Sequence, residues 1–229
     1  MQQTAEEART ERINAMGEDL GSLFDALWQQ LNFAKMKWRE YVSLYGTNEK
    51  RIALLNAAAP RFFGRLDAIL WEDILLHIAR LTDSPSTFGR QDRANLSIRA
   101  LPPLINDLSL RDTVTQRVRS AVDAAEFARD WRNRHIAHRD LQRALERDAE
   151  PLAFASRACV NGAFEKMQSV MNTIQVHYLD SETHYDVPNS SGSATSLLHV
   201  LHYGVQKMTE RRERIARGEW NWETDEPKL

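Results

Sequence analysis

Residues 60–81 read PRFFGRLDAILWEDILLHIARL, the clearest helical pattern in the chain. Large apolar residues recur there every three or four positions, which is the period of one face of an α-helix. Pro60 stands where the first turn of a helix accepts proline, and Asp83, Ser84 and Pro85 follow as a stop signal. The stretch predicts a long helix, whose apolar positions are Phe63, Leu66, Ile69, Leu70, Ile74, Ile78 and Leu81.

The same spacing recurs on both sides of this stretch. The further predicted helices are a long one from Leu20 to Tyr45, ended by Gly46; a short one through Ile52 and Leu55; one from Leu110 to Trp131 and beyond; one opened by Pro151 and ending near Asp180; and one from Ala194 to Arg217. Residues 84–103, which contain Gly89 and the pair Pro102-Pro103, predict a connection with at most a short helix around 96–101.

These patterns predict an all-α fold: four long helices in an up-down bundle with an additional C-terminal helix. No run alternates with period two over a useful length, and the low count of nine Gly and seven Pro disfavours an all-β chain. Residues 186–196 have the composition of a linker. We therefore expect a helical bundle at 1–185, followed at 186–229 by the linker, the last helix and a polar tail.

The composition excludes several classes of protein. Thirty Lys and Arg against 32 Asp and Glu give a net charge of −2, which argues against a protein whose whole surface meets nucleic acid. The only cysteine, Cys159, can form neither an intramolecular disulfide nor a thiolate zinc site. The apolar runs are interrupted by charge and the first twenty residues are too polar for a secretory signal, so we expect no membrane span and a cytoplasmic location.

The densest polar block is RDWRNRHIAHRD, residues 129–140. Arginine binds phosphate oxygens in a bidentate manner, and a histidine with a pKa of about 6.5 can accept and donate a proton. Metal-free cleavage of an RNA phosphodiester needs these two groups. Residues 111–147 hold nine Arg against six Asp and Glu, a local positive excess. The alternative is a solvated, charge-laced helix end.

Two histidine pairs are spaced three residues apart, His135 with His138 and His199 with His202. Such a pair can offer two imidazoles to a metal from one helical face. Neither pair has an evident third ligand in the sequence. We therefore expect solvated or core-edge histidines rather than a metal site.

The order of several short blocks resembles the AbiU-type branch of the HEPN superfamily. The resemblance runs from about Trp38 to Tyr178, and within it residues 132–140, RNRHIAHRD, fall where that branch has an RNxxIAHRD-like block. The other shared blocks are Leu54-Leu55-Asn56, Pro60-Arg61-Phe62-Phe63, Trp71-Glu72-Asp73-Ile74-Leu75-Leu76, Ala79-Arg80-Leu81-Thr82-Asp83 and Asn95-Leu96-Ser97-Ile98.

The resemblance assigns roles to individual residues. It implies that His138 is the acid/base, that Arg132 holds the phosphate and its transition state, and that Asn133 orients by hydrogen bonding. Arg129 with His135 is the alternative register of the same arginine–histidine signature. The residues expected to contact substrate are Arg129, Arg134, His135 and Arg139. No metal or other cofactor is expected.

Regular helix geometry separates the two principal residues. Six residues rotate by about 600° and rise about 9 Å, so Arg132 and His138 would lie roughly 120° apart and would not meet on one phosphate. Either the helix breaks within the block, or a second subunit brings its own copy across a two-fold axis. HEPN enzymes commonly use such a dimer, and we therefore expect a homodimer with these blocks facing each other.

The resulting hypothesis is a metal-independent HEPN endoribonuclease that acts in phage defence or as a toxin, by attack of the 2′-hydroxyl on the adjacent phosphorus. RNA is the expected substrate, and an antitoxin or defence protein is a candidate partner. HEPN domains without cleavage activity are also known. The competing hypothesis is accordingly a non-catalytic helical module whose arginines bind a protein partner or nucleic acid without turnover.

Overall fold

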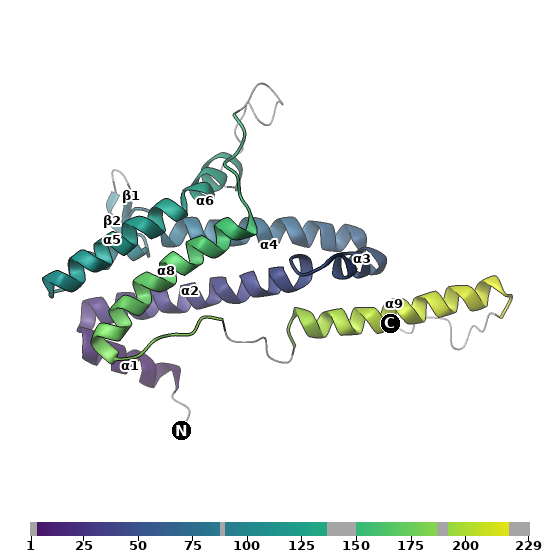
Figure 1. Ribbon diagram of the computed structural model, residues 1–229, viewed down its shortest axis with the longest axis horizontal. Coiled ribbons are helices and arrows are strands. Elements are labelled where there is room, and N and C mark those ends of the chain that lie inside the picture. The colour runs from purple at the N-terminus through teal and green to yellow at the C-terminus, as the bar shows by residue number, and fades with distance from the viewer. Residues whose placement is uncertain (1–3, 88–89, 137–149, 187–191, 220–229) are drawn as a thin grey trace. The chain divides into compact units, whose positions relative to one another are not determined.

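A computed structural model describes residues 4–87, 90–136, 150–186 and 192–219 (Figure 1). Helices dominate these residues, and the predicted all-α class is confirmed. No helix among them is both long and apolar enough to cross a membrane. The elements are α1 (Ala5–Met16), α2 (Glu18–Tyr45), α3 (Glu49–Ala58), α4 (Pro60–Leu81), β1 (Ser86–Thr87), β2 (Arg90–Ala94), the 3-10 turns Ile98–Ala100 and Pro102–Leu104, α5 (Leu108–Ala124), α6 (Glu126–Trp131), a π-helical turn Arg132–Ile136, α8 (Arg157–Leu179) and α9 (Ala194–Ala216).

The helix limits follow local capping chemistry. Asp107 and Ser156 accept hydrogen bonds from amides in the first turns of α5 and α8, which satisfies N–H groups that have no partner within a helix. Asp180, the residue after the end of α8, adopts a left-handed conformation with φ of 46°. Pro60 opens α4 and Gly46 follows the end of α2, as the sequence predicts.

Three local features differ from the sequence-based prediction. A helix before Leu20 was not predicted, because α1 buries only Arg12 and Met16 and lacks a clear apolar stripe. The connection after α4 contains an antiparallel pair of very short strands, β1 and β2, too short for a period-two signal. The helix expected to open at Pro151 begins instead at Arg157, because residues 150–153 make backbone contacts elsewhere.

The chain folds into two compact units. The first contains residues 1–37 and 71–187, and α5 packs against α8 within it. Each of its four long helices contributes fully buried side chains, and burying one such side chain contributes about 1.5–3 kcal/mol. The core includes Phe24, Leu27 and Leu31 from α2, Ile74, Leu75 and Ile78 from α4, Val114 and Ala121 from α5, and Phe164, Met167, Val170 and Ile174 from α8.

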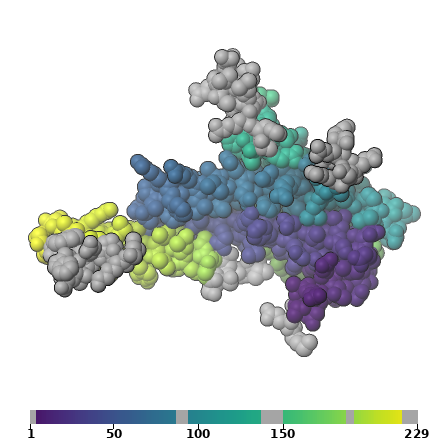
Figure 2. All heavy atoms as spheres, turned by 180° about the vertical axis from the view of Figure 1, so that it is seen from behind, coloured from purple at the N-terminus to yellow at the C-terminus, as the bar shows by residue number. Residues whose placement is uncertain are grey.

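The second unit contains residues 38–70 and 188–229, and in it α3 packs against α9. Its buried cluster is Leu44, Leu55, Phe63, Ala194 and Leu198. The first N–H of α9 donates to the Glu40 carboxylate at 2.6 Å, which ties the start of that helix to α2. In the space-filling view α4 is open to solvent on the face shown (Figure 2). The expected boundary between 1–185 and 186–229 stays a prediction about domains, because these units describe packing alone.

α1 and α2 meet in a tight corner. Gly17 adopts a φ of 85°, which a side chain would strain, and it ends α1 one residue before α2 begins. Four residues later, Gly21 lies against the backbone of α1. A Cβ added at Gly21 would lie 2.6 Å from the Ile13 Cα and 2.8 Å from the Arg12 carbonyl oxygen. The corner therefore depends on the absence of a side chain at Gly21.

Candidate active site

The backbone departs from regular α-helix at the block that the sequence singles out. α6 ends at Trp131, and residues 132–136 form a π-helical turn, a geometry often found at functional sites. One of the two predicted ways to reconcile Arg132 with His138 was a break in the helix within this block. At Arg132 the α-helix changes to a π-helical turn, so the chain departs from regular geometry there without leaving the helix. His138 and Arg139 lie outside the described residues, so their positions are not part of this geometry.

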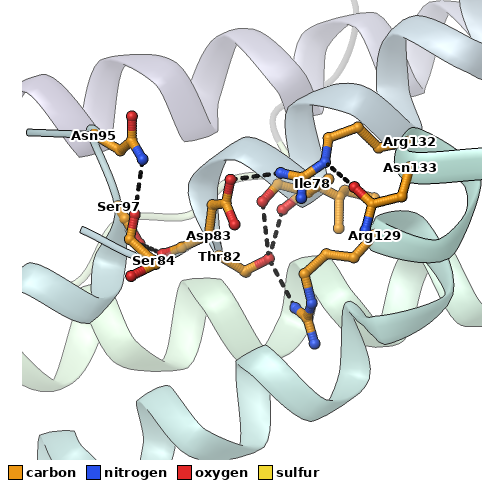
Figure 3. Close-up of polar contacts among 10 residues, drawn as sticks. Ile78, Thr82, Asp83, Ser84, Asn95, Ser97, Arg129, Arg132 and Asn133 are labelled. Atoms are coloured by element: carbon orange, nitrogen blue, oxygen red, sulfur yellow. Dashed lines mark hydrogen bonds and ion pairs between the residues drawn. The ribbon is translucent and has the colours of Figure 1, made fainter. Parts of the chain in front are cut away.

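Arg132 is held in a fixed orientation at the end of α4 (Figure 3). Its Nη1 pairs with the Asp83 carboxylate at 2.5 Å, and its Nε donates to the Asn133 side-chain oxygen at 2.9 Å. The Arg132 side chain is 20% exposed and that of Asp83 is 33% exposed. The Nη2 group makes no hydrogen bond within the described part of the chain. It therefore remains available to an anion.

Arg129 points to the same end of α4, but both amino groups of its guanidinium donate hydrogen bonds within the protein. Its Nη2 donates to the Val122 carbonyl at 2.8 Å and its Nη1 to the Thr82 hydroxyl at 3.4 Å. Burial lowers the pKa of Arg129, and the nearby Glu126 carboxylate partly opposes this. Thr82 is fully buried and donates in turn to the Ile78 carbonyl (Figure 3). Arg129 thus joins the end of α5 to the end of α4.

The connection after α4 holds Asp83 in place. The Ser97 hydroxyl donates to the Asp83 carbonyl at 2.6 Å, and the Asn95 amide donates to the Ser84 carbonyl at 2.9 Å. Ser97 also caps the 3-10 turn that carries Arg99. Because the Asp83 backbone is fixed in this way, its carboxylate can orient Arg132.

A third arginine, Arg99, belongs to this neighbourhood. Arg99, Arg132, Asp83 and Glu126 all lie close enough to Arg129 to influence its pKa. Three guanidinium groups therefore face two carboxylates, which leaves a local excess of positive charge. Sequence reasoning missed Arg99, since thirty residues separate it from Arg129 and no motif links the two.

The His135 side chain contacts a different part of α4. Its Nε2 lies 3.2 Å from the Glu72 carboxylate, and its ring meets Trp131 edge-on with centroids 5.5 Å apart. Thr82, the partner of Arg129, directly follows the end of α4 and stands ten residues after Glu72, which is about 15 Å in helical geometry. Arg129 and His135, the alternative pair, therefore contact partners about three helical turns apart.

Arg134 and its neighbours bind the segment that precedes α8. The Arg134 guanidinium donates to the carbonyls of Glu150 and Pro151. The Trp131 indole donates to the Ala153 carbonyl at 2.9 Å. Asp130 pairs with Arg134 and also accepts from the Ala153 amide. These contacts occupy Arg134, a residue predicted to bind substrate, and explain why no helix starts at Pro151.

No group of three or more metal-ligating side chains is present within the described ranges. His199 and His202 are both exposed on α9. The pair His135 and His138 falls partly outside those ranges.

A second polar cluster connects α2 and α4. His77 is 8% exposed, and its Nδ1 lies 3.2 Å from the Asp73 carbonyl oxygen and 3.6 Å from the Asp73 carboxylate. Lys37 pairs with Asp73 at 2.7 Å, and the Phe33 ring meets His77 edge-on. Burial lowers the pKa of His77, and the positive charges of Lys37 and Arg80 act in the same direction against the influence of Asp73.

The lowered pKa of His77 predicts a pH-dependent stability. The unfolded state binds a proton on His77 more readily than the folded state does. The contribution of His77 to the free energy of unfolding is therefore fully present above about pH 6.5, and it is lost as the pH falls through the lower pKa of the folded state. Urea unfolding between pH 7.5 and 5.0 is expected to show this loss. His77→Gln should reduce it, and an unchanged pH dependence in that variant would contradict the assignment.

A comparison with models of protein families shows the family of this chain. Residues 17–196 match the family model of HEPN domains described as AbiU2. The chain belongs to the AbiU2 family of HEPN proteins. The match starts at the corner between α1 and α2 and ends in the first turn of α9, and it includes Arg132 and Asn133. The resemblance seen in the sequence is thereby confirmed. Comparisons with curated proteins and with solved structures gave no match.

Proposed function

We propose that this AbiU2 protein is a metal-independent endoribonuclease acting in phage defence or as a toxin. Membership in a HEPN family supports the general class of role. The observation that carries the proposal is the fixed orientation of Arg132, which Asp83 and Asn133 hold beside Arg129 and within reach of Arg99. A preorganised cation of this kind stabilises the charge that develops on a phosphate in the transition state.

In the proposed reaction the 2′-hydroxyl oxygen attacks the adjacent phosphorus while a base removes its proton. The bond from phosphorus to the 5′-oxygen then breaks, and an acid protonates that oxygen. The products are a 2′,3′-cyclic phosphate and a free 5′-hydroxyl. His138 is the proposed proton carrier, Arg132 binds the non-bridging oxygens, and Asn133 orients Arg132.

Contacts made by the other register support this choice of residues. The Arg129 guanidinium donates hydrogen bonds to Val122 and Thr82. His135 contacts Glu72, which lies about 15 Å from Thr82 in helical geometry. Arg132 instead keeps one amino group without a partner in the described residues. We therefore propose that Arg132 and His138 form the active register, with Arg129, Arg134, His135 and Arg139 around the substrate.

We also propose a homodimer in which two copies of the block face each other, so that one His138 acts as base and the other as acid. Sedimentation at micromolar concentration is expected to give a dimer. A monomeric particle would count against the shared site.

Cleavage in the presence of a chelator tests the proposed function. Purified protein with RNA in excess EDTA is expected to yield products ending in a 2′,3′-cyclic phosphate. His138→Ala should lower the rate about 100-fold to 10,000-fold, the range of general acid–base catalysis. Cleavage that survives in this variant, or that requires a divalent metal, contradicts the mechanism. Binding of RNA without cleavage would favour the non-catalytic module.

A further inference from the structure

A groove of about 220 Å³ lies between α5 and α8, in the first compact unit. Five polar side chains line it: Gln116, Arg117 and Ser120 from α5, and Lys166 and Ser169 from α8. Sites for drug-sized molecules occupy about 300–1,000 Å³, so this groove is small for a nucleoside but roomy for a phosphate group with some of its water.

The lining has the chemistry of an anion site. Arg117 and Lys166 carry positive charge, the two serine hydroxyls and the glutamine amide can donate hydrogen bonds, and no carboxylate is among the five. The Arg117 guanidinium donates to the Ser169 hydroxyl on the opposite helix, so it extends across the groove. Hydroxyls, amides and cations of this kind make most protein contacts to nucleic-acid phosphates.

Arg117 and Lys166 are both exposed at the groove. Within the described part of the chain, neither Arg117 nor Lys166 forms an ion pair with a carboxylate. Five other cations of the unit each pair with an aspartate: Arg12 with Asp25, Lys35 with Asp186, Lys37 with Asp73, Arg132 with Asp83 and Arg134 with Asp130. Two cations and three hydrogen-bonding side chains around one concavity, with no carboxylate in its lining, can receive an anion.

We propose that this groove binds a phosphodiester of the RNA strand on one side of the cleavage point. The inference rests on the proposed ribonuclease function. Arg117 lies about 10 Å of helix before the end of α5, and α6 follows directly with Arg129 and then Arg132. A single strand held by these arginines can therefore reach the groove with flanking nucleotides. Binding at a point remote from the reacting bond adds affinity and positions the substrate.

Binding to uncleavable RNA tests the groove apart from catalysis. The probes are a trinucleotide and a twelve-nucleotide strand, both 2′-O-methylated and fluorescently labelled, titrated at several salt concentrations. The variants are Arg117→Ala and Lys166→Ala, with Lys166→Gln as a milder change. Arg119→Ala is the matched control, because Arg119 is exposed on the same helix but does not line the groove.

Each groove variant should weaken binding of the long strand about fivefold to tenfold, the scale of one charge-assisted contact. It should also make the fall of log K with log salt less steep by about 0.7, the contribution of one phosphate contact to a single strand. Affinity for the trinucleotide, and both affinities of the control, should not change. Long-strand binding equal to that of the control overturns the inference, as does an equal loss on the trinucleotide.

Cleavage assays separate this inference from the proposed function. If wild-type protein does not cleave RNA but the groove variants weaken long-strand binding, the function fails and the groove stands. If cleavage depends on His138 while the groove variants bind like wild type, the groove alone fails. Absence of RNA binding in the wild type overturns both.

Discussion

Arg132→Ala is expected to reduce the rate of RNA cleavage about 100-fold to 1,000-fold, the scale of removing one oriented donor from a transition state. The reason lies in the position of this guanidinium, which Asp83 and Asn133 hold from two sides while its Nη2 group has no hydrogen-bond partner among the described residues. Arg132→Lys should restore little of the rate, because an ammonium keeps the charge but cannot reproduce the planar arrangement of donors.

Asp83→Asn distinguishes orientation from direct contact. The amide is nearly isosteric but carries no charge, so Arg132 loses its ion pair while its own side chain is intact. We expect an intermediate loss of kcat, since the guanidinium becomes less well ordered. Single-turnover rates at saturating RNA in EDTA measure the effect, with Arg119→Ala as a surface control on charge. A wild-type rate in Arg132→Ala would remove this residue from the mechanism.

Gly21→Ala is expected to destabilise the protein by about 1–3 kcal/mol, the range for forcing atoms into a packed contact. The new Cβ would meet the backbone of α1 at Ile13 and Arg12, which cannot turn aside as a flexible side chain could. α1 must therefore shift away from α2. Equilibrium urea unfolding measures the change, and circular dichroism at low urea shows whether the folded state retains its helix content.

Gly162→Ala provides a control of opposite sign. This glycine lies within α8, and a Cβ there would have no heavy atom within 4 Å. Alanine is favoured over glycine in a helix interior by roughly 0.5–1 kcal/mol, so this variant should be stabilised. Destabilisation of both variants, or of neither, would contradict the close approach at Gly21.

Most helices could be predicted because their signals are local. In residues 60–81 the apolar spacing, the opening proline and the stop at Asp83 all agree, and the helix occupies this range. The start of α8 was predicted wrongly, because Pro151 is a local signal that longer-range contacts override. Arg134, Trp131 and Asp130 bind the backbone of residues 150–153, and the helix begins only after the Ser156 cap.

In the candidate site, too, local sequence signals could be predicted and longer-range contacts could not. Its arginines and histidines stand in one short block, so the sequence pointed to residues 129–140 without knowledge of the fold. Asp83 and Arg99 could not be found in this way, because only the return of the chain after α4 brings them to Arg129 and Arg132. Spacing alone left two registers open, and the different partners of Arg129, Arg132 and His135 support the proposal that Arg132 belongs to the active one.

By itself the sequence determined the all-α class, most helix limits, the family and the block proposed as the active site, because periodicity, capping and short motifs act over a few residues. Only the tertiary structure decided which partners the arginines of the described residues have. It placed Arg132 on Asp83, bound Arg134 to the backbone before α8, and left Arg117 and Lys166 around a groove without a carboxylate. Those outcomes depend on which surfaces meet when the helices pack, since a charge is compensated by its neighbours in space rather than in sequence.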